Sequence, residues 1–355
     1  GTQVAMACST ARTGEERKER LFVGDGKGGN VQIWDWRTGK RLLEPIATPT
    51  EPRGLAFHPN GKALVVVCAD YRVVFIDPDT GTITHHLDPG VRTRPFDANL
   101  WWGNGEAHFS PDGRFLVTWE LARPVHVWDA ATKQLLHTLS HNERVESVAS
   151  SPTDPTVLAT AGRDSSVRVW DLNTGKALAQ LQHPAHTWRV KFHPNGRDLF
   201  TSCADGMFRV WDWQAGKLSD GLLPHAESLM DFAFPANRWL VTLGERTLLL
   251  MDWQTRSHVT PLLPMGKHLS LRLGLPAGEK QLFVGGFSGT LDAYDWQSLT
   301  IPIRGDPADL RRLAEVIAGR RIVNGQVVPL DSAECAARWQ HLQRASSVRE
   351  LLDPE

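Results

Sequence analysis

Residues 141–181 read HNERVESVASSPTDPTVLATAGRDSSVRVWDLNTGKALAQL. Four short apolar runs, at residues 145–150, 157–161, 166–170 and 178–181, are typical of β-strands. Pro, Gly, Asn and Asp separate the runs and favour turns. A single four-stranded sheet of this kind exposes two apolar faces, so it needs a similar sheet on each side. The stretch therefore predicts a repeat protein.

The polar residues of this stretch have a regular spacing. Trp170-Asp171 closes the third run, Thr160 lies ten residues before Trp170, Asp164 lies six before it, and His141 precedes the first run. In this pattern the chain resembles the WD-repeat family of β-propellers. The resemblance implies a hydrogen-bonded chain of four side chains, in which an indole donates, a hydroxyl relays and a carboxylate accepts.

The next repeat keeps this spacing with His183, Thr201, Asp205 and Trp211. We interpret both sets of four residues as structural links and not as a catalytic His/Asp/Ser arrangement. Other repeats depart from the pattern, and we place Val117 at the hydroxyl position of the third repeat. Hydrophobic packing is expected to hold the sheet where the polar chain is incomplete.

Closures of the same type recur along the chain. An apolar residue followed by Asp is found at Trp34-Asp35, Ile76-Asp77, Trp128-Asp129, Trp170-Asp171, Trp211-Asp212, Met251-Asp252 and Tyr294-Asp295. Successive Asp residues are 42, 52, 42, 41, 40 and 43 positions apart, and all but one interval falls in the range of about 40–45 residues for a propeller blade. Asn-Gly and Asp-Gly pairs predict hairpins between the first and second strands. We therefore predict an all-β fold, a seven-bladed β-propeller of four-stranded antiparallel blades, over residues 1–304.

Residues 305–355 do not follow the repeat. Asp306-Pro307 is typical of a helix start, and Asn324-Gly325 predicts a hairpin. Asp331 and Glu334 form a capping box for a second helix. We expect a mainly helical extension, helix–hairpin–helix, packed on the propeller. Its layout resembles tails that follow propellers in bacterial multidomain proteins such as serine/threonine kinases with WD repeats.

Composition limits the class of partner. The formal net charge is −1, which gives no indication of nucleic acid or of an anionic membrane as a partner. The four cysteines lack CxxC spacing, and we interpret them as reduced thiols of a cytoplasmic protein. No His pair has a third ligand at metal-like spacing, so neither a metal nor another cofactor is expected. We expect the isolated chain to be monomeric.

One connection is longer than its counterparts. The 52-residue interval comes from residues 88–108, DPGVRTRPFDANLWWGNGEAH, between the second and third repeats. Its Arg92, Arg94, Phe96, Trp101 and Trp102 are of types enriched in binding hot spots. They are candidate partner-binding residues. The alternative is that the two tryptophans form a local core beneath the loop.

The sequence contains no catalytic motif that we recognise. We therefore predict a non-enzymatic scaffold that binds a protein or peptide through loops. The alternative is the sensory or regulatory C-terminal region of a bacterial serine/threonine protein kinase whose catalytic domain lies outside this chain. Fold alone does not identify the partner.

Overall fold

The computed structural model describes residues 3–9, 29–35, 40–88, 106–119, 124–224, 229–244, 247–255, 257–260, 263–264, 270–274, 281–286, 291–295, 320–323 and 326–329. The chain divides into two compact units, Gly1–Trp296 and Gln297–Glu355. In the described part of the first unit there are seven antiparallel sheets, and the second contains one two-stranded hairpin. The expected all-β fold is confirmed for these residues.

Four successive sheets share one order, in which each strand pairs with the next along the chain. The second sheet contains β5 (Pro52–Phe57), β6 (Leu64–Cys68), β7 (Val73–Ile76) and β8 (Ile83–Leu87). The third contains β9 (Glu106–Phe109), β10 (Phe115–Trp119), β11 (Val125–Asp129) and β12 (Leu135–Leu139). The fourth contains β13 (Val145–Ser150), β14 (Val157–Gly162), β15 (Ser166–Asp171) and β16 (Lys176–Gln182). The fifth contains β17 (Thr187–Phe192), β18 (Asp198–Cys203), β19 (Met207–Asp212) and β20 (Lys217–Pro224).

The remaining sheets of this unit differ from the expected four strands. In the first sheet, β1 (Gln3–Ser9) pairs with β2 (Gly29–Asp35), which also pairs with β3 (Lys40–Arg41) and β4 (Ile46–Thr48). The sixth contains β21 (Leu229–Ala236), β22 (Trp239–Gly244), β23 (Thr247–Asp252), β24 (Ser257–His258) and β25 (Leu263–Pro264). The seventh contains β26 (Ser270–Gly274), β27 (Gln281–Gly286) and β28 (Leu291–Asp295).

The first sheet begins at a different position of the repeat. Trp34-Asp35 ends β2, whereas the corresponding Trp170-Asp171 ends β15, the third strand of its sheet. By this correspondence β1 is a second strand, and β3 and β4 are two pieces of an outer strand. Among the described residues the first sheet therefore has no inner strand, which differs from the expectation of a complete set in every repeat.

The hydrophobic core lies between sheets. One cluster joins Val169 and Leu181 of the fourth sheet to Val190 and Leu199 of the fifth, and similar clusters join the other successive sheets from the first to the sixth. Each second strand has a neighbouring sheet on both faces, so all residues of β6, β10 and β14 are buried. The outer strand β16 is mostly exposed.

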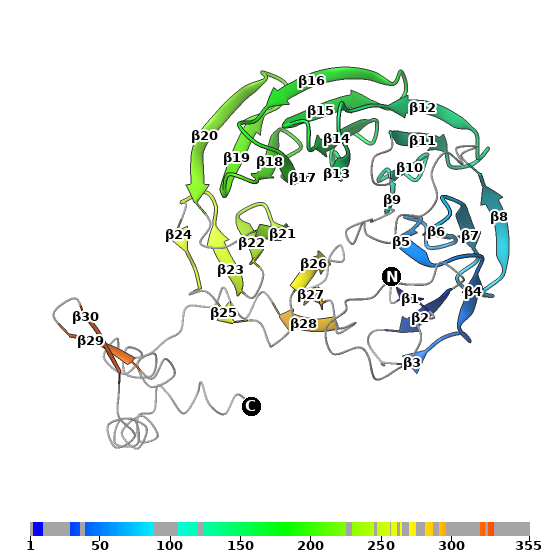
Figure 1. The fold of residues 1–355 in the computed structure, drawn as a ribbon, viewed down its shortest axis with the longest axis horizontal. Helices are drawn as coiled ribbons and strands as arrows, with labels where there is room; N and C mark the ends of the chain where they lie inside the picture. Colours follow the sequence, from blue (N-terminus) through cyan, green and yellow to red (C-terminus); the bar gives the residue numbers. More distant parts are fainter. Residues whose placement is uncertain are drawn as a thin grey trace. The chain divides into compact units, whose positions relative to one another are not determined.

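The inner strands contact one another in chain order. The contacts run from β5 to β9, to β13, to β17, to β21 and to β26, and β1 contacts β5. Figure 1 shows the sheets of the first unit side by side along an arc, with these strands on the inside and β8, β12, β16 and β20 on the outside. This arrangement is consistent with a propeller. The closure of seven blades into a ring stays a prediction.

The expected hairpins are present between first and second strands. Gly61, Gly113 and Gly196 have φ of 75°, 76° and 72°, the left-handed region that the Asn-Gly and Asp-Gly pairs were expected to supply. All three turns lie at one end of the strands, called here the hairpin end. The connections after the second strand and after the outer strand lie at the opposite end, called here the loop end.

In the second unit, β29 (Arg320–Val323) pairs with β30 (Gln326–Pro329), which matches the expected hairpin. The two expected helices, and the boundary expected after residue 304, lie outside the described residues. The packing of this extension stays a prediction. Among the residues that the structure describes, none forms a helix that is long and apolar enough to cross a bilayer.

Candidate functional site

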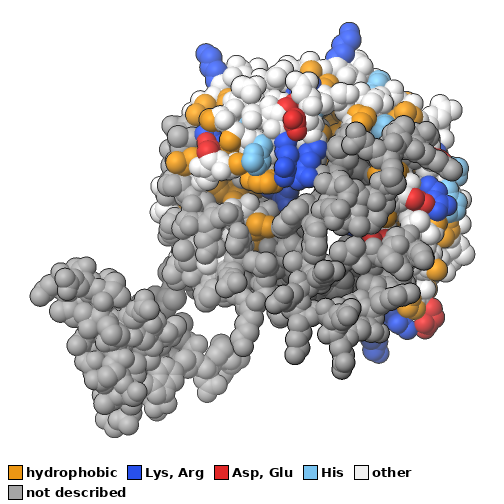
Figure 2. All heavy atoms as spheres, in the orientation of Figure 1, with side chains coloured by type: hydrophobic (Ala, Val, Ile, Leu, Met, Phe, Trp, Pro, Cys, Tyr) orange, Lys and Arg blue, Asp and Glu red, His pale blue; other side chains and the backbone are white. Residues whose placement is uncertain are grey.

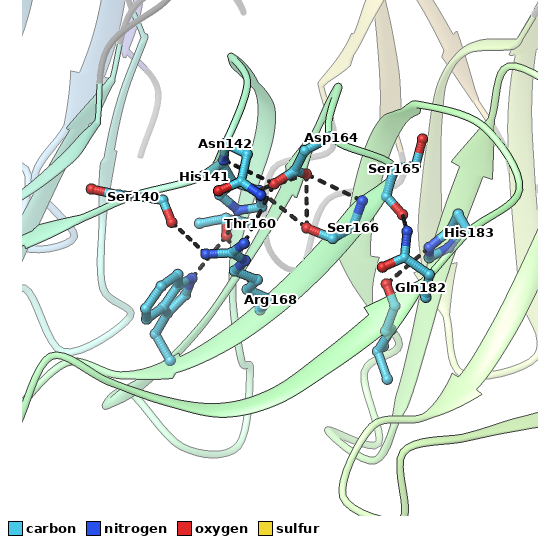
Figure 3. Close-up of polar contacts among 12 residues, drawn as sticks. Ser140, His141, Asn142, Thr160, Asp164, Ser165, Ser166, Arg168, Gln182 and His183 are labelled. Carbon is cyan, nitrogen blue, oxygen red and sulfur yellow. Dashed lines mark hydrogen bonds and ion pairs between the residues drawn. The ribbon is translucent and has the colours of Figure 1, made fainter.

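The fourth sheet brings together the first set of four residues. The His141 Nδ1–H donates to Asp164 Oδ1 at 3.0 Å, and the Thr160 hydroxyl donates to His141 Nε2 at 2.7 Å. The Trp170 indole donates to the same Thr160 oxygen at 2.8 Å. Figure 3 shows this chain running from the loop end at Asp164 down to the indole. The spacing predicted these contacts because all four residues belong to one repeat.

The electrostatics favour a neutral imidazole. Burial lowers the pKa of His141 below its ordinary value, while the hydrogen bond to Asp164 acts in the opposite direction. Burial also acts to raise the pKa of Asp164, but hydrogen bonds from His141 and Ser166 outweigh burial and leave this pKa lowered. Asp164 is therefore an anion beside a neutral His141 at pH 7.

The hydroxyl of this set is inaccessible. Thr160 is 0% exposed, and the side chain of His141 is also 0% exposed. A substrate therefore cannot reach the Thr160 hydroxyl. The hydrogen-bonded arrangement of Thr160, His141 and Asp164 is not suited to nucleophilic catalysis. The four residues are placed to link the loop end to the outer strands.

The fifth sheet brings together only three of its four expected residues. His183 Nε2 lies 2.9 Å from Thr201 Oγ1, and the Trp211 indole donates to the same oxygen at 3.2 Å. His183 Nδ1, however, faces the Leu181 carbonyl oxygen at 3.2 Å. Asp205 forms an ion pair with Arg209 instead. The expectation that Asp205 completes the chain through His183 differs from this geometry.

The third sheet retains the hydrogen bond from the indole to a hydroxyl, but the predicted hydroxyl position was wrong. The Trp128 indole donates to Thr118 Oγ1 at 2.9 Å, so Thr118 and not Val117 occupies the hydroxyl position. The signal was available, because Thr118 lies ten residues before Trp128, as Thr160 does before Trp170. Val117 is buried in the packing between the third and fourth sheets.

The candidate partner-binding residues of the long connection, Arg92, Arg94, Phe96, Trp101 and Trp102, lie outside the described residues. The structure describes the strands on either side, β8 and β9. The choice between a binding loop and a local core stays a prediction.

A second candidate site lies at the loop end of the fourth and fifth sheets. We call Arg144, Glu146, Arg163, His186 and Trp188 the Arg–Trp cluster. Both arginines donate from Nε to the same carboxylate oxygen of Glu146. The Arg163 guanidinium carbon lies 5.3 Å from the Trp188 ring centroid, a cation–π distance. The His186 ring packs edge-on against the Trp188 ring, with centroids 4.4 Å apart.

The cluster joins two consecutive repeats. Arg144 and Glu146 belong to the start of β13, Arg163 follows β14, and Trp188 belongs to β17. Figure 2 shows Lys and Arg side chains gathered with acidic and His side chains over the region where Figure 1 draws β13 and β17. Sequence reasoning missed this site. The available signal was Arg163, which directly precedes Asp164 and therefore lies at the loop end.

The ionisable groups of the cluster are unequal in exposure. The side chain of Arg163 is 37% exposed, whereas those of Arg144 and Glu146 are 14% and 12% exposed. Burial and the nearby Arg163 lower the pKa of His186, so this imidazole is neutral at pH 7. A search of the described residues found no group of three or more His, Cys, Asp or Glu side chains placed to hold a metal ion.

Residues 133–171 and 175–212 match the family model described as WD domain, G-beta repeat. These two segments are WD40 repeats. Each begins near the outer strand of one sheet and ends at the third strand of the next, so a WD40 repeat links two neighbouring sheets.

Relatives extend the similarity beyond these two WD40 repeats. COMPASS component SWD3 of Saccharomyces cerevisiae is 25% identical over 260 residues, 66% of this chain and 76% of that protein. Transducin beta-like protein 3 of Bos taurus is 30% identical over 223 residues, 61% of this chain and 26% of that protein. DNA damage-binding protein 2 of Oryza sativa subsp. japonica is 24% identical over 267 residues, 71% of this chain and 43% of that protein. Together with the repeat match, these relatives support the WD-repeat propeller family.

The chain thus spans about three quarters of the yeast relative but less than half of the bovine and rice proteins. These relatives are eukaryotic, and they lend no support to the expected resemblance to bacterial kinases. Among solved structures, the computationally designed Ika8 protein aligns with a TM-score of 0.59 at 19% identity, covering 76% of this chain and 80% of that one. That likeness shows the fold alone.

Proposed function

We propose that this chain is a non-enzymatic protein-binding scaffold, a closed seven-bladed WD-repeat propeller whose loop end recruits a protein partner. The Arg–Trp cluster carries the proposal, because Trp and Arg are the residue types most enriched in binding hot spots. Trp188 is partly exposed there and has an arginine on its face. The relative from yeast is named as a component of COMPASS, and membership of an assembly fits such a role.

The geometry of the cluster fits a partner better than it fits a reaction. Its one carboxylate, Glu146, accepts a hydrogen bond from the Nε of each of two arginines, and these bonds fix its orientation. Arg163 presents the rest of its planar guanidinium toward solvent, a shape suited to recognition of a partner group. Glu146 and Trp188 lie on the inner strands β13 and β17, and support by regular strands is what a binding site requires.

The hairpin end supplies a matched control. Arg238 lies 4.9 Å from the Trp239 ring centroid and is paired with Asp252, so the sixth sheet carries a second Arg–Trp stack. This stack lies where β21 turns into β22, at the hairpin end. If the partner binds at the loop end, loss of Trp239 leaves binding intact.

The test uses the 355-residue chain and its Trp188→Ala and Trp239→Ala variants as baits in cells that express it. Bound proteins are quantified by mass spectrometry and then cross-linked to map the contact. We expect at least one protein to be retained by the wild type and by Trp239→Ala, lost by Trp188→Ala, and cross-linked near β13 and β17. Equal capture by all three baits would contradict the proposal. Melting temperatures of the variants establish that each bait is folded.

The long connection at residues 88–108 is proposed as a further contact for the same partner. The loss of capture in a Trp101→Ala, Trp102→Ala double variant with an unchanged melting temperature would support it. A large drop in melting temperature with normal capture would identify the two tryptophans as local core. A cytoplasmic location and a monomeric state stay predictions.

A further inference from the structure

The Arg–Trp cluster has more positive than negative charge. Arg144 and Arg163 both use Nε to bind Glu146, so one carboxylate compensates two guanidinium groups. The more exposed of the two is Arg163, at 37% of its side chain. Within the described part of the chain, neither guanidinium has another acidic partner. One unit of positive charge therefore lies at the loop end beside Trp188.

Neighbouring groups do not cancel this charge. Arg189 is itself positively charged, and its guanidinium donates to the backbone carbonyl oxygens of Met230 and Trp188. Asp164 is bound by His141, and Asp205 is bound by Arg209. Asp164 and Asp205 therefore have partners of their own. Glu143, which directly precedes Arg144, is exposed and forms no ion pair with either arginine among the described residues.

We propose that the Arg–Trp cluster binds a carboxylate side chain in an acidic peptide segment of the partner protein. This inference rests on the proposed scaffold function and specifies the chemistry of the partner. The Arg163 guanidinium offers two Nη groups to the carboxylate, in the planar geometry that carboxylates prefer. Trp188 provides a flat apolar wall for the peptide beside it.

The charge of the cluster favours a carboxylate over a phosphate. A carboxylate carries one negative charge, which matches the net charge of +1 that Arg144, Arg163 and Glu146 leave within the Arg–Trp cluster. A phosphoserine carries about 1.5 to 2 negative charges at pH 7, and Glu146 would repel this larger charge. The hairpin-end stack of Arg238 and Trp239 has no such excess, because Asp252 compensates Arg238 one to one.

The test selects peptides without assuming a partner. A random decapeptide library displayed on phage is panned on the 355-residue chain, with Arg163→Ala as the counter-selection bait and Arg238→Ala as the matched control. Synthetic copies of the enriched peptides are then measured by fluorescence anisotropy, together with copies in which Glu is changed to Gln and Asp to Asn. A phosphoserine copy and anionic phosphatidylserine vesicles are measured beside them.

The proposal predicts enriched peptides that contain Asp or Glu. Affinity should fall about tenfold or more for the amide copies and for Arg163→Ala, because the hydrogen-bonded charge pair is lost. Trp188→Ala should lower affinity by a similar factor, because it removes the apolar surface beside the bound peptide. Arg238→Ala should leave the affinity unchanged. Much tighter binding of the phosphoserine copy, or binding of the vesicles alone, would overturn the choice of a carboxylate.

A second variant does not depend on loss of function. Glu146→Gln removes the competing carboxylate, so acidic peptides should bind two- to fivefold more tightly. Weaker or equal binding would overturn the inference. Enriched peptides that lack acidic residues but still require Trp188 would also overturn it, and would leave the scaffold function standing. Peptides that bind equally well to Trp188→Ala and Arg163→Ala would contradict both.

Discussion

The fourth and fifth sheets start from the same four residue types, with Thr, Asp and Trp at the same spacing, yet only the fourth completes the hydrogen-bonded chain. Asp164 receives hydrogen bonds from His141 and from the Ser166 hydroxyl, the latter at 2.7 Å. Asp205 has Met207 at the position of Ser166, and Met offers no hydroxyl donor. Arg209 takes Asp205 instead. The two carboxylates thus differ in a neighbour that is outside the four-residue pattern, Ser166 beside Asp164 and Met207 beside Asp205.

The two carboxylates also differ in how deeply they are buried. The side chain of Asp164 is 6% exposed, whereas that of Asp205 is 27% exposed. His183 is left with the Leu181 carbonyl as the partner of Nδ1, and burial lowers its pKa to about 4. His141 has an anion in contact with Nδ1, which opposes the effect of burial on its pKa. The two sheets should therefore respond differently to acid and to mutation.

Acid should have the largest effect, and of these two sheets it should act mainly on the fifth. The folded pKa of His183, about 4, lies below the ordinary value of 6.5, so the unfolded state binds more protons between these pH values. The stabilisation is present above pH 6.5 and is lost as the pH falls toward 4. The loss is about 3 kcal/mol of unfolding free energy.

Urea denaturation of the wild type and of His183→Gln at pH 7 and pH 4 measures this loss. The stability difference between the two proteins should narrow by about 3 kcal/mol at the lower pH. The stability difference between the wild type and His141→Gln should narrow by less over the same pH change. A constant difference for His183→Gln would show that this histidine is not held neutral.

Asp164→Ala should have the next largest effect. It removes the acceptor for the His141 Nδ1, the Asn142 backbone N–H and the Ser166 hydroxyl. Leaving buried donors without a partner lowers the unfolding free energy by about 2 kcal/mol. Asp205→Ala is the matched change, and we expect a smaller loss of about 1 kcal/mol. Asp205 is itself 27% exposed, but its removal leaves Arg209, which is 8% exposed, without a counter-ion. Equal midpoints of chemical unfolding for the two variants would contradict the contrast between the sheets.

Met207→Ser should have the smallest effect on stability, within about 0.5 kcal/mol, because Met207 is only partly buried. It gives Asp205 the hydroxyl donor that Asp164 has in Ser166. We expect Asp205 to turn toward His183 and to raise the pKa of that histidine. NMR titration of the His183 ring in the wild type and in Met207→Ser follows this change. An unchanged titration would mean that Arg209, and not the missing hydroxyl, controls Asp205.

Much of the fold could be predicted from the sequence, because each repeat is decided by short-range patterns. The Trp-Asp closures, the Asn-Gly turns and the contacts of His141, Thr160 and Trp170 lie within about 40 residues of one another. In the third repeat Thr118 follows the same rule, and the prediction placed the hydroxyl position one residue too early, at Val117. The seven-bladed ring is an extrapolation of this spacing.

The sequence did not predict which neighbouring side chains and strands these residues contact. The spacing that predicts a hydrogen bond from His183 to Asp205 says nothing of the competition from Arg209, which depends on side-chain orientation where the turn at Asp205 enters β19. Likewise, nothing in the spacing showed that the first sheet has β1 as a second strand, because strand order is a property of pairing.

The sequence by itself determined the repeat, its strands and turns, and the polar chain of the fourth sheet, because these depend on residues within one repeat. Only the tertiary structure decided the Arg–Trp cluster. Arg163 follows β14 and Trp188 belongs to β17, and the two side chains meet because these strands lie in neighbouring sheets. A site that is shared between repeats has no fixed spacing in the sequence, so the packing of one sheet against the next is what creates it.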